Sequence, residues 1–92
     1  MGPMLFSLGQ VVATPGALRA LEDSEQSPAD FLGRHVTGDW GELPEEDCKE
    51  NELSLKNGFR ILSAYRLRSG KKIWVITEAD RSATTIPLPE EY

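Results

Sequence analysis

The chain has 92 residues and a formal net charge of −5, with 15 acidic residues against 10 lysines and arginines. This length suits a single domain, and the acidic balance argues against general nucleic-acid binding, which needs cations to neutralise phosphates. The one cysteine, Cys48, excludes an internal disulfide, and no run approaches the roughly 20 apolar residues of a membrane span.

The start of the chain has no apolar segment of the secretory type, which together with the lone cysteine favours a cytoplasmic protein. Residues 1–3 precede a second methionine, Met4, and are typical of an expression scar. We therefore expect residues 4–92 to form one domain.

The first 58 residues predict one short strand and three short helices. Leu5–Thr14 alternates weakly in hydrophobicity and predicts a strand that can join the edge of a sheet. Thr14-Pro15 and Ser27-Pro28 are helix starts, because a capping hydroxyl precedes a proline at the first helical position. A third helix is expected over Pro44–Lys56, where acidic residues in the first turn favour the helix dipole and Asn57-Gly58 ends the helix.

The strongest strand character lies in the last third of the chain. Ile61–Leu67 and Lys72–Ala79 are rich in β-branched and aromatic residues and flank Ser69-Gly70, which predicts a hairpin. A turn centred there would pair Tyr65 with Trp74. The predicted core face consists of Ile61, Tyr65, Leu67, Trp74 and Ile76.

A third strand is expected over Thr84–Leu88, and Pro87 should confine it to an edge or end it early. These elements predict the α+β class. The sheet would be antiparallel, with three strands in a C-terminal meander and the N-terminal strand as a possible fourth, covered on one face by two or three short helices.

Residues able to carry catalysis are few. His35 is the only histidine and falls at an inward helical position, so we interpret it as a hydrogen-bonded core or boundary residue. Cys48 lies among carboxylates, which disfavour a reactive thiolate. The acidic run around it lacks the spacing and central glycine of a calcium loop. We therefore predict no catalytic residue, no metal site and no cofactor.

Two surface clusters are the candidate binding sites. Residues 1–58 hold 11 acids and 4 bases, so the cover of the sheet is acidic and could attract a basic partner. The partner-binding candidates are Asp39, Trp40, Glu42, Glu45, Glu46 and Asp47. The alternatives are a solvated helix face for the carboxylates and a core anchor for the tryptophan.

The second cluster follows the second strand of the hairpin. An arginine between carboxylates, with hydroxyls nearby, could bind an anionic ligand group or could form a structural ion pair. The ligand-binding candidates are Glu78, Asp80, Arg81 and Thr84.

Several segments together resemble a known family, namely LGQVVATPGALRAL, RHVTGDWGEL, EDCKEN and LSAYRLRSGKKIWVITEADRSATTI. The family consists of small proteobacterial proteins from plasmids and integrated mobile elements, labelled plasmid-related or uncharacterised and sometimes as a restriction-enzyme modification subunit. The resemblance runs from Leu5 to Tyr92 and departs from the family at Pro87. It implies no catalytic residues, and the modification label fails because a methyltransferase needs a much larger cofactor domain.

Three functional hypotheses follow. The first is a non-enzymatic protein-interaction module of a bacterial mobile genetic element, which would modulate a host defence or nucleic-acid-processing protein. The second is a small RNA-cleaving or nucleotide-binding protein that uses the basic side of the hairpin and Arg81, in line with a weaker resemblance to compact bacterial ribonuclease toxins. The third is a structural subunit of a homo-oligomer. The sequence identifies neither the partner nor the oligomeric state.

Overall fold

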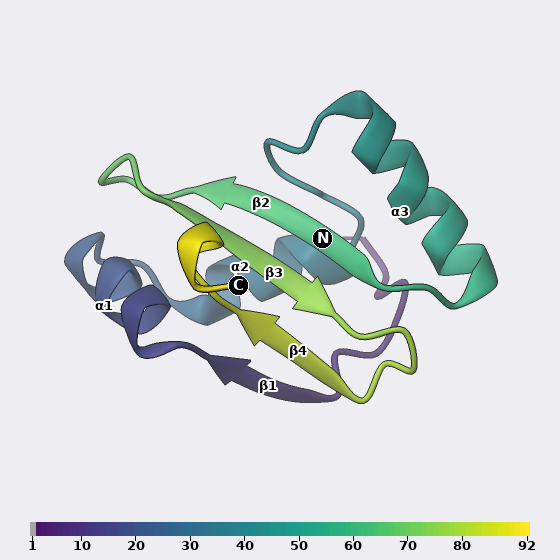
Figure 1. Cartoon of the computed structure of the whole chain (residues 1–92), viewed down its shortest axis with the longest axis horizontal. Helices are drawn as coiled ribbons and strands as arrows, with labels where there is room; N and C mark the ends of the chain where they lie inside the picture. Colours follow the sequence, from purple (N-terminus) through teal and green to yellow (C-terminus); the bar gives the residue numbers. More distant parts are fainter. Residues whose placement is uncertain (1) are drawn as a thin grey trace.

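The computed structural model describes residues 2–92, and Met1, part of the segment 1–3 set apart above, lies outside the described residues. The predicted α+β class is confirmed: residues 2–92 form three α-helices, four strands and a short 3-10 turn near the C-terminus, arranged as in Figure 1. The elements are β1 (Gln10–Ala13), α1 (Pro15–Asp23), α2 (Pro28–Val36), α3 (Glu45–Asn57), β2 (Ile61–Arg66), β3 (Lys72–Thr77), β4 (Ala83–Ile86) and η1 (Pro89–Glu91).

The four strands form one sheet in the order β1-β4-β3-β2. The C-terminal meander is antiparallel, as predicted, but β1 lies parallel to β4, with Val11 beside Thr84. The sheet is therefore mixed, which corrects the antiparallel expectation for this strand. Because the helices and the other strands separate β1 from β4 in sequence, the chain can bring β4 back in the same direction.

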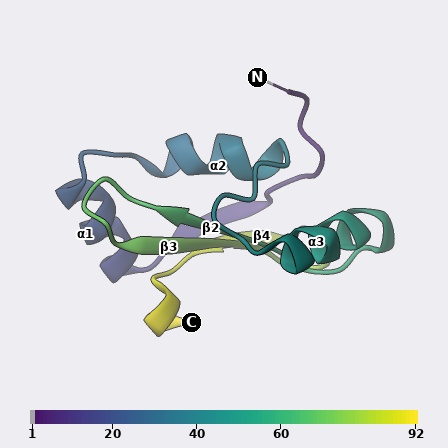
Figure 2. The ribbon, with the colours of Figure 1, turned by 90° about the horizontal axis from the view of Figure 1, so that it is seen from above.

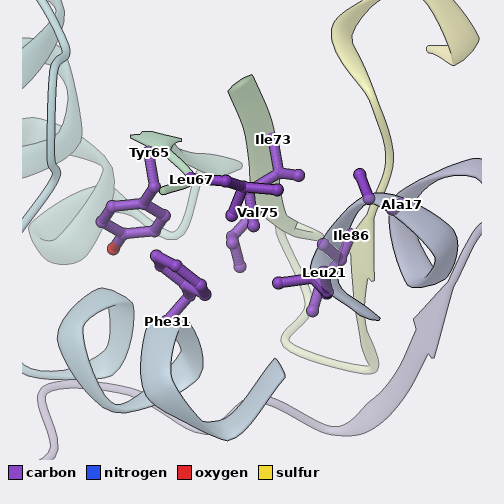
Figure 3. Close-up of a cluster of buried hydrophobic side chains, with 9 residues drawn as sticks. Ala17, Leu21, Phe31, Tyr65, Leu67, Ile73, Val75 and Ile86 are labelled. Carbon is purple, nitrogen blue, oxygen red and sulfur yellow. The ribbon is translucent and has the colours of Figure 1, made fainter. Parts of the chain in front are cut away.

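The helices occupy different sides of the sheet. Figure 2 shows α2 over one face, η1 on the opposite face and α3 beside the β2 edge. The main core lies between α1, α2 and the sheet, and most of it is labelled in Figure 3. Its buried members are Ala17, Ala20, Leu21, Phe31, Tyr65, Leu67, Ile73, Val75 and Ile86.

The predicted register of the hairpin is wrong by one residue. Tyr65 lies beside Ile73, and Trp74 lies beside Ala64. The connection has five residues rather than four, because Arg66 pairs with Lys72. A shift of one residue turns every side chain of a strand to the other face.

The change of register exchanges the residues that β3 contributes to the core. Ile73 and Val75 are fully buried on the helix-covered face. Trp74 lies on the opposite face, where its ring meets that of Tyr92 edge-on with centroids 6.0 Å apart. Trp74 and Ile76 are therefore not members of the core that packs against α1 and α2.

Candidate interaction site

The GDWG turn runs alongside β2 as a short extra strand. The backbone N–H of Ala64 donates to the carbonyl of Trp40 (3.1 Å), and the N–H of Glu42 donates to the carbonyl of Ala64 (2.7 Å). Gly41 between them has a φ of 73°, and a Cβ on it would lie 2.0 Å from the Ala64 carbonyl oxygen. Glycine is therefore required at this position.

The side chain of Asn51 pairs with the same outer edge of β2, two residues before Ala64. The Asn51 side-chain amide donates to the carbonyl of Leu62 (2.7 Å) and accepts from the N–H of Leu62 (3.2 Å). Asn51 thus imitates a neighbouring strand and attaches α3 to the sheet. The buried residues of α3 are Asn51 and Ser54, so this helix is held by polar contacts rather than by an apolar stripe.

Trp40 lies in the interior, which is the alternative interpretation considered for it. Its side chain is 6% exposed and its ring stacks on Phe6 with centroids 6.4 Å apart. The indole N–H donates to a carboxylate oxygen of Glu52 (3.2 Å), which satisfies the one polar group of the ring.

Asp39 and Glu42 are engaged in local ion pairs. The Arg34 guanidinium donates to Asp39 at 2.7 Å and holds the pKa of that carboxyl below its usual value. Glu42 accepts from Arg66 at 3.1 Å, and this hydrogen bond likewise lowers its pKa. Both carboxylates therefore fix the turn against α2 and β2, although each is still open to solvent.

The first half of α3 carries an exposed acidic face. We use this name for Glu45, Glu46, Asp47 and Glu50, all of which are exposed. Within residues 2–92, the ion-pair contact to this face is a 4.0 Å approach of Lys49 to Glu45, both of them highly exposed. A pair of this kind contributes little stability, so the acidic face is almost uncompensated.

A groove separates α3 from β2 beside the acidic face. It has a volume of about 450 Å³ and combines apolar and charged walls. Phe59 lines this groove with 59% of its surface exposed, so its ring is open to a molecule that enters the groove. The groove is lined by Leu43, Asp47, Glu50, Asn51, Ser54, Phe59, Arg60 and Leu62.

The four ligand-binding candidates do not converge on one surface. The Arg81 guanidinium donates to three backbone carbonyls, those of Phe59 (2.7 Å), Glu78 (3.1 Å) and Ser54 (3.1 Å). It thereby caps the end of α3 and joins it to the β3–β4 turn.

The other three candidates have separate local roles. Glu78 pairs with Arg60 at 3.4 Å, and Asp80 accepts from the backbone and hydroxyl of Ser82. Thr84 is fully buried, so its hydroxyl lies away from the solvent that surrounds the other two.

A buried polar chain lies between α2 and the sheet, and its directions can be assigned step by step. Thr84 Oγ1 donates to the carbonyl of Leu8 (2.7 Å) and must therefore accept from Thr77 Oγ1 (2.8 Å). Thr77 in turn accepts from Nε2 of His35 (2.9 Å). With Nε2 protonated, the neutral imidazole accepts at Nδ1 from the hydroxyl of Ser63 (2.5 Å).

The placement of His35 agrees with its interpretation as a hydrogen-bonded core residue. The side chain is fully buried, and burial lowers its pKa to about 4, with a smaller contribution from the charge of Arg81. Ser63 and Thr77, the two hydroxyls that hold the ring, were not singled out by sequence. For Ser63 the available signal was a hydroxyl on the predicted core face, whereas Thr77 reaches the helix-covered face only in the observed register.

The N-terminal segment, residues 4–9, closes over this polar chain, and we call it the N-terminal strap. Its backbone is tied to α2 by the N–H of Leu5, which donates to the carbonyl of Val36 (2.8 Å). The Phe6 ring meets the His35 ring edge-on at 5.1 Å between centroids and lies 5.6 Å below the Arg81 guanidinium carbon. The strap therefore separates His35 from solvent.

Within residues 2–92, no group of three or more histidine, cysteine, aspartate or glutamate side chains is arranged to hold a metal ion. The helices of this part of the chain are all too short or too polar to cross a membrane.

Comparison with known proteins gives no relative: no family model, curated protein or solved structure matches the chain. The geometry of the acidic face and its groove is therefore the basis on which function can be argued.

Proposed function

We propose that this protein is a non-enzymatic interaction module that binds a basic segment of a bacterial partner protein in the groove between α3 and β2. The observation that carries the proposal is the exposed acidic face beside a groove in which Phe59 is 59% exposed. Complementary charge speeds encounter and selects the partner, while a central aromatic residue supplies affinity.

The groove accounts for only part of the sequence-predicted surface. Glu45, Glu46 and Asp47 belong to the proposed binding surface, and Glu50 and Phe59 are added to it. Asp39 and Glu42 would act indirectly, because their ion pairs fix the turn that leads into α3. The basic hairpin side does not favour an RNA-cleaving function, since Arg60, Arg66 and Lys72 pair with carboxylates and Arg81 with backbone carbonyls.

The biological setting follows from the family resemblance and is part of the same proposal. The module would be encoded by a mobile element, work in the cytoplasm and modulate a host defence or nucleic-acid-processing protein. Such a partner would present lysines and arginines on a nucleic-acid-binding surface, which is the chemistry that an acidic face can compete for.

The test is capture of a partner from a nuclease-treated proteobacterial lysate by three forms of the protein. The test form is the triple variant Glu46→Gln, Asp47→Asn, Glu50→Gln. The control form, Glu22→Gln, Asp23→Asn, Glu90→Gln, removes the same charge from exposed sites elsewhere. We expect the first variant to lose about tenfold or more in affinity and the control to bind as the parent does, with salt weakening the parent complex.

A second pair of variants tests the apolar part of the groove. Phe59→Ala should weaken partner binding by about tenfold without changing stability by more than about 0.5 kcal/mol, because the ring is largely exposed. Leu53→Ala truncates an exposed apolar residue of α3 that does not line the groove, and it should leave binding unchanged. Equal capture by all forms, or a protein that is captured only from lysate not treated with nuclease, would refute the proposal.

A further inference from the structure

The two edges of the sheet differ in whether their outer backbone groups have hydrogen-bond partners. The outer edge of β2 is closed, because Asn51 pairs with the backbone of Leu62 and the GDWG turn pairs with Ala64. The outer edge of β1, at the opposite margin of the sheet, has no ribbon beyond it in Figure 1. An uncovered strand edge is a template for pairing with another strand.

The hydrogen bonds of β1 show which groups point outward. The N–H groups of Gln10 and Thr14 donate to Ser82 and Ile86, so alternate residues of this parallel pair face β4. Val11 and Ala13 lie between them and direct their N–H and C=O groups away from the sheet. Among the described residues, these four groups have no backbone partner.

The β1 edge also lacks the usual protection against pairing. Natural edge strands carry charges, prolines or bulges that prevent association. The β1 sequence, QVVA, has none of these, and its register with β4 is regular. Val11 and Val12 are 40% and 44% exposed, one on each face of the sheet.

We infer that β1 pairs antiparallel with β1 of a second copy of this chain, joining two four-stranded sheets into one of eight strands. The outward groups determine the register. Val11 of each copy exchanges both backbone hydrogen bonds with Ala13 of the other, and Val12 faces Val12 of the second copy across the two-fold axis. All four open groups of each strand are then paired.

A second copy fits this edge better than an unrelated strand for two reasons. The register is self-complementary, so one short sequence satisfies both sides of the contact. The chain also carries a net charge of −5, so two copies repel each other over most of their surface. The uncharged β1 edge is a place where they can meet without bringing like charges together.

The first test measures the oligomeric state of the full chain by light scattering and sedimentation, up to a protein concentration of about 1 mM, because an edge of four residues gives a weak contact. We expect a dimer that dissociates on dilution. Val12→Lys should make the protein monomeric by placing two ammonium groups face to face, whereas Leu53→Lys adds the same charge on α3 and should leave the dimer intact.

The second test is a cross-link that does not depend on affinity. At a two-fold position that is not hydrogen-bonded, the Cα atoms lie about 4.5 Å apart, which a disulfide can span. In a Cys48→Ser background, Val12→Cys should form a covalent dimer on mild oxidation far faster than Leu53→Cys. Circular dichroism checks that each variant is folded.

The inference is overturned if the parent is monomeric at the highest concentration and Val12→Cys cross-links no faster than Leu53→Cys. It is also overturned if β1 variants abolish capture of a different protein while the parent chain alone stays monomeric. The α3 neutralisation described above should not weaken the dimer, and Val12→Lys should not change capture through the groove, so the two proposals fail separately.

Discussion

At the scale of single residues, His35 is a titratable group with a structural role, because its neutral ring packs in the core. Its two ring nitrogens are satisfied by Ser63 and Thr77, and the hydrogen-bond chain that ends at Leu8 assigns the proton to Nε2. An imidazolium would have to donate at both nitrogens, which would reverse the Ser63 hydroxyl and place a charge in the core. The buried chain is therefore built for the neutral ring.

This arrangement predicts how stability depends on pH. The pKa of His35 is about 4 in the folded protein and about 6.5 when unfolded, so between these values the unfolded chain binds an additional proton. The stabilisation from neutral His35 is complete above pH 6.5 and is lost as pH falls towards 4. It amounts to about 3 kcal/mol at most, measurable by urea unfolding across this pH range.

The control is His35→Gln, which keeps a polar side chain but cannot titrate. This variant should be less stable at neutral pH and should lose most of the pH dependence between 6.5 and 4. Carboxylates with lowered pKa values, such as Asp39 and Glu91, act in a lower window as pH falls through their folded pKa values. An unchanged slope in His35→Gln would show that the imidazole is not the titrating group.

At the scale of secondary-structure elements, α3 depends on one side chain to an unusual degree. Asn51→Ala removes both contacts with Leu62 and leaves a strand edge without partners, so we expect a loss of about 1–3 kcal/mol in the free energy of unfolding. Asn57→Ala, at the exposed end of the same helix, should be neutral or slightly stabilising, because alanine favours helix. Equal effects of the two substitutions in thermal unfolding would contradict the edge-capping role.

The elements were predictable from sequence where their signals are local. The helix starts at Thr14-Pro15 and Ser27-Pro28 and the stop at Gly58 depend on neighbouring residues only, and the structure confirms them. The register of the hairpin was not predictable, because both faces of β3 are rich in apolar residues and a connection of four or five residues fits the pattern.

The parts of the site were likewise predictable only where they depend on residues that are neighbours in sequence. The exposure of the acidic face follows from its composition, and the structure leaves it in solvent. Trp40 gave no signal that distinguishes a surface contact from an anchor, because its neighbours Phe6 and Glu52 are distant in sequence. Asn51 and the groove beside it arise only when α3 meets β2.

At the scale of the whole molecule, both ends of the described chain are fastened to the same sheet. The N-terminal strap accepts from Thr84 of β4, and Glu91 near the C-terminus accepts from the Thr14 hydroxyl that caps α1. Residues 4–9 contribute no member to the core cluster between α1, α2 and the sheet. The strap is therefore a segment whose removal should leave most of the core in place while it uncovers His35.

The last prediction concerns that cover. A variant that begins at Leu8 keeps the carbonyl bonded to Thr84 but lacks the Phe6 ring, so water should reach the imidazole. Since burial is the main cause of the lowered pKa, the pKa of His35 should rise from about 4 towards 6.5. The only histidine of the chain gives one imidazole signal, which an NMR titration can follow.

Phe6→Ala should give a smaller rise in the pKa of His35, and removal of residues 89–92 should give none. An imidazole pKa still near 4 in the folded variant that begins at Leu8 would mean that α2 and the sheet alone exclude solvent, and that the strap is not the cover.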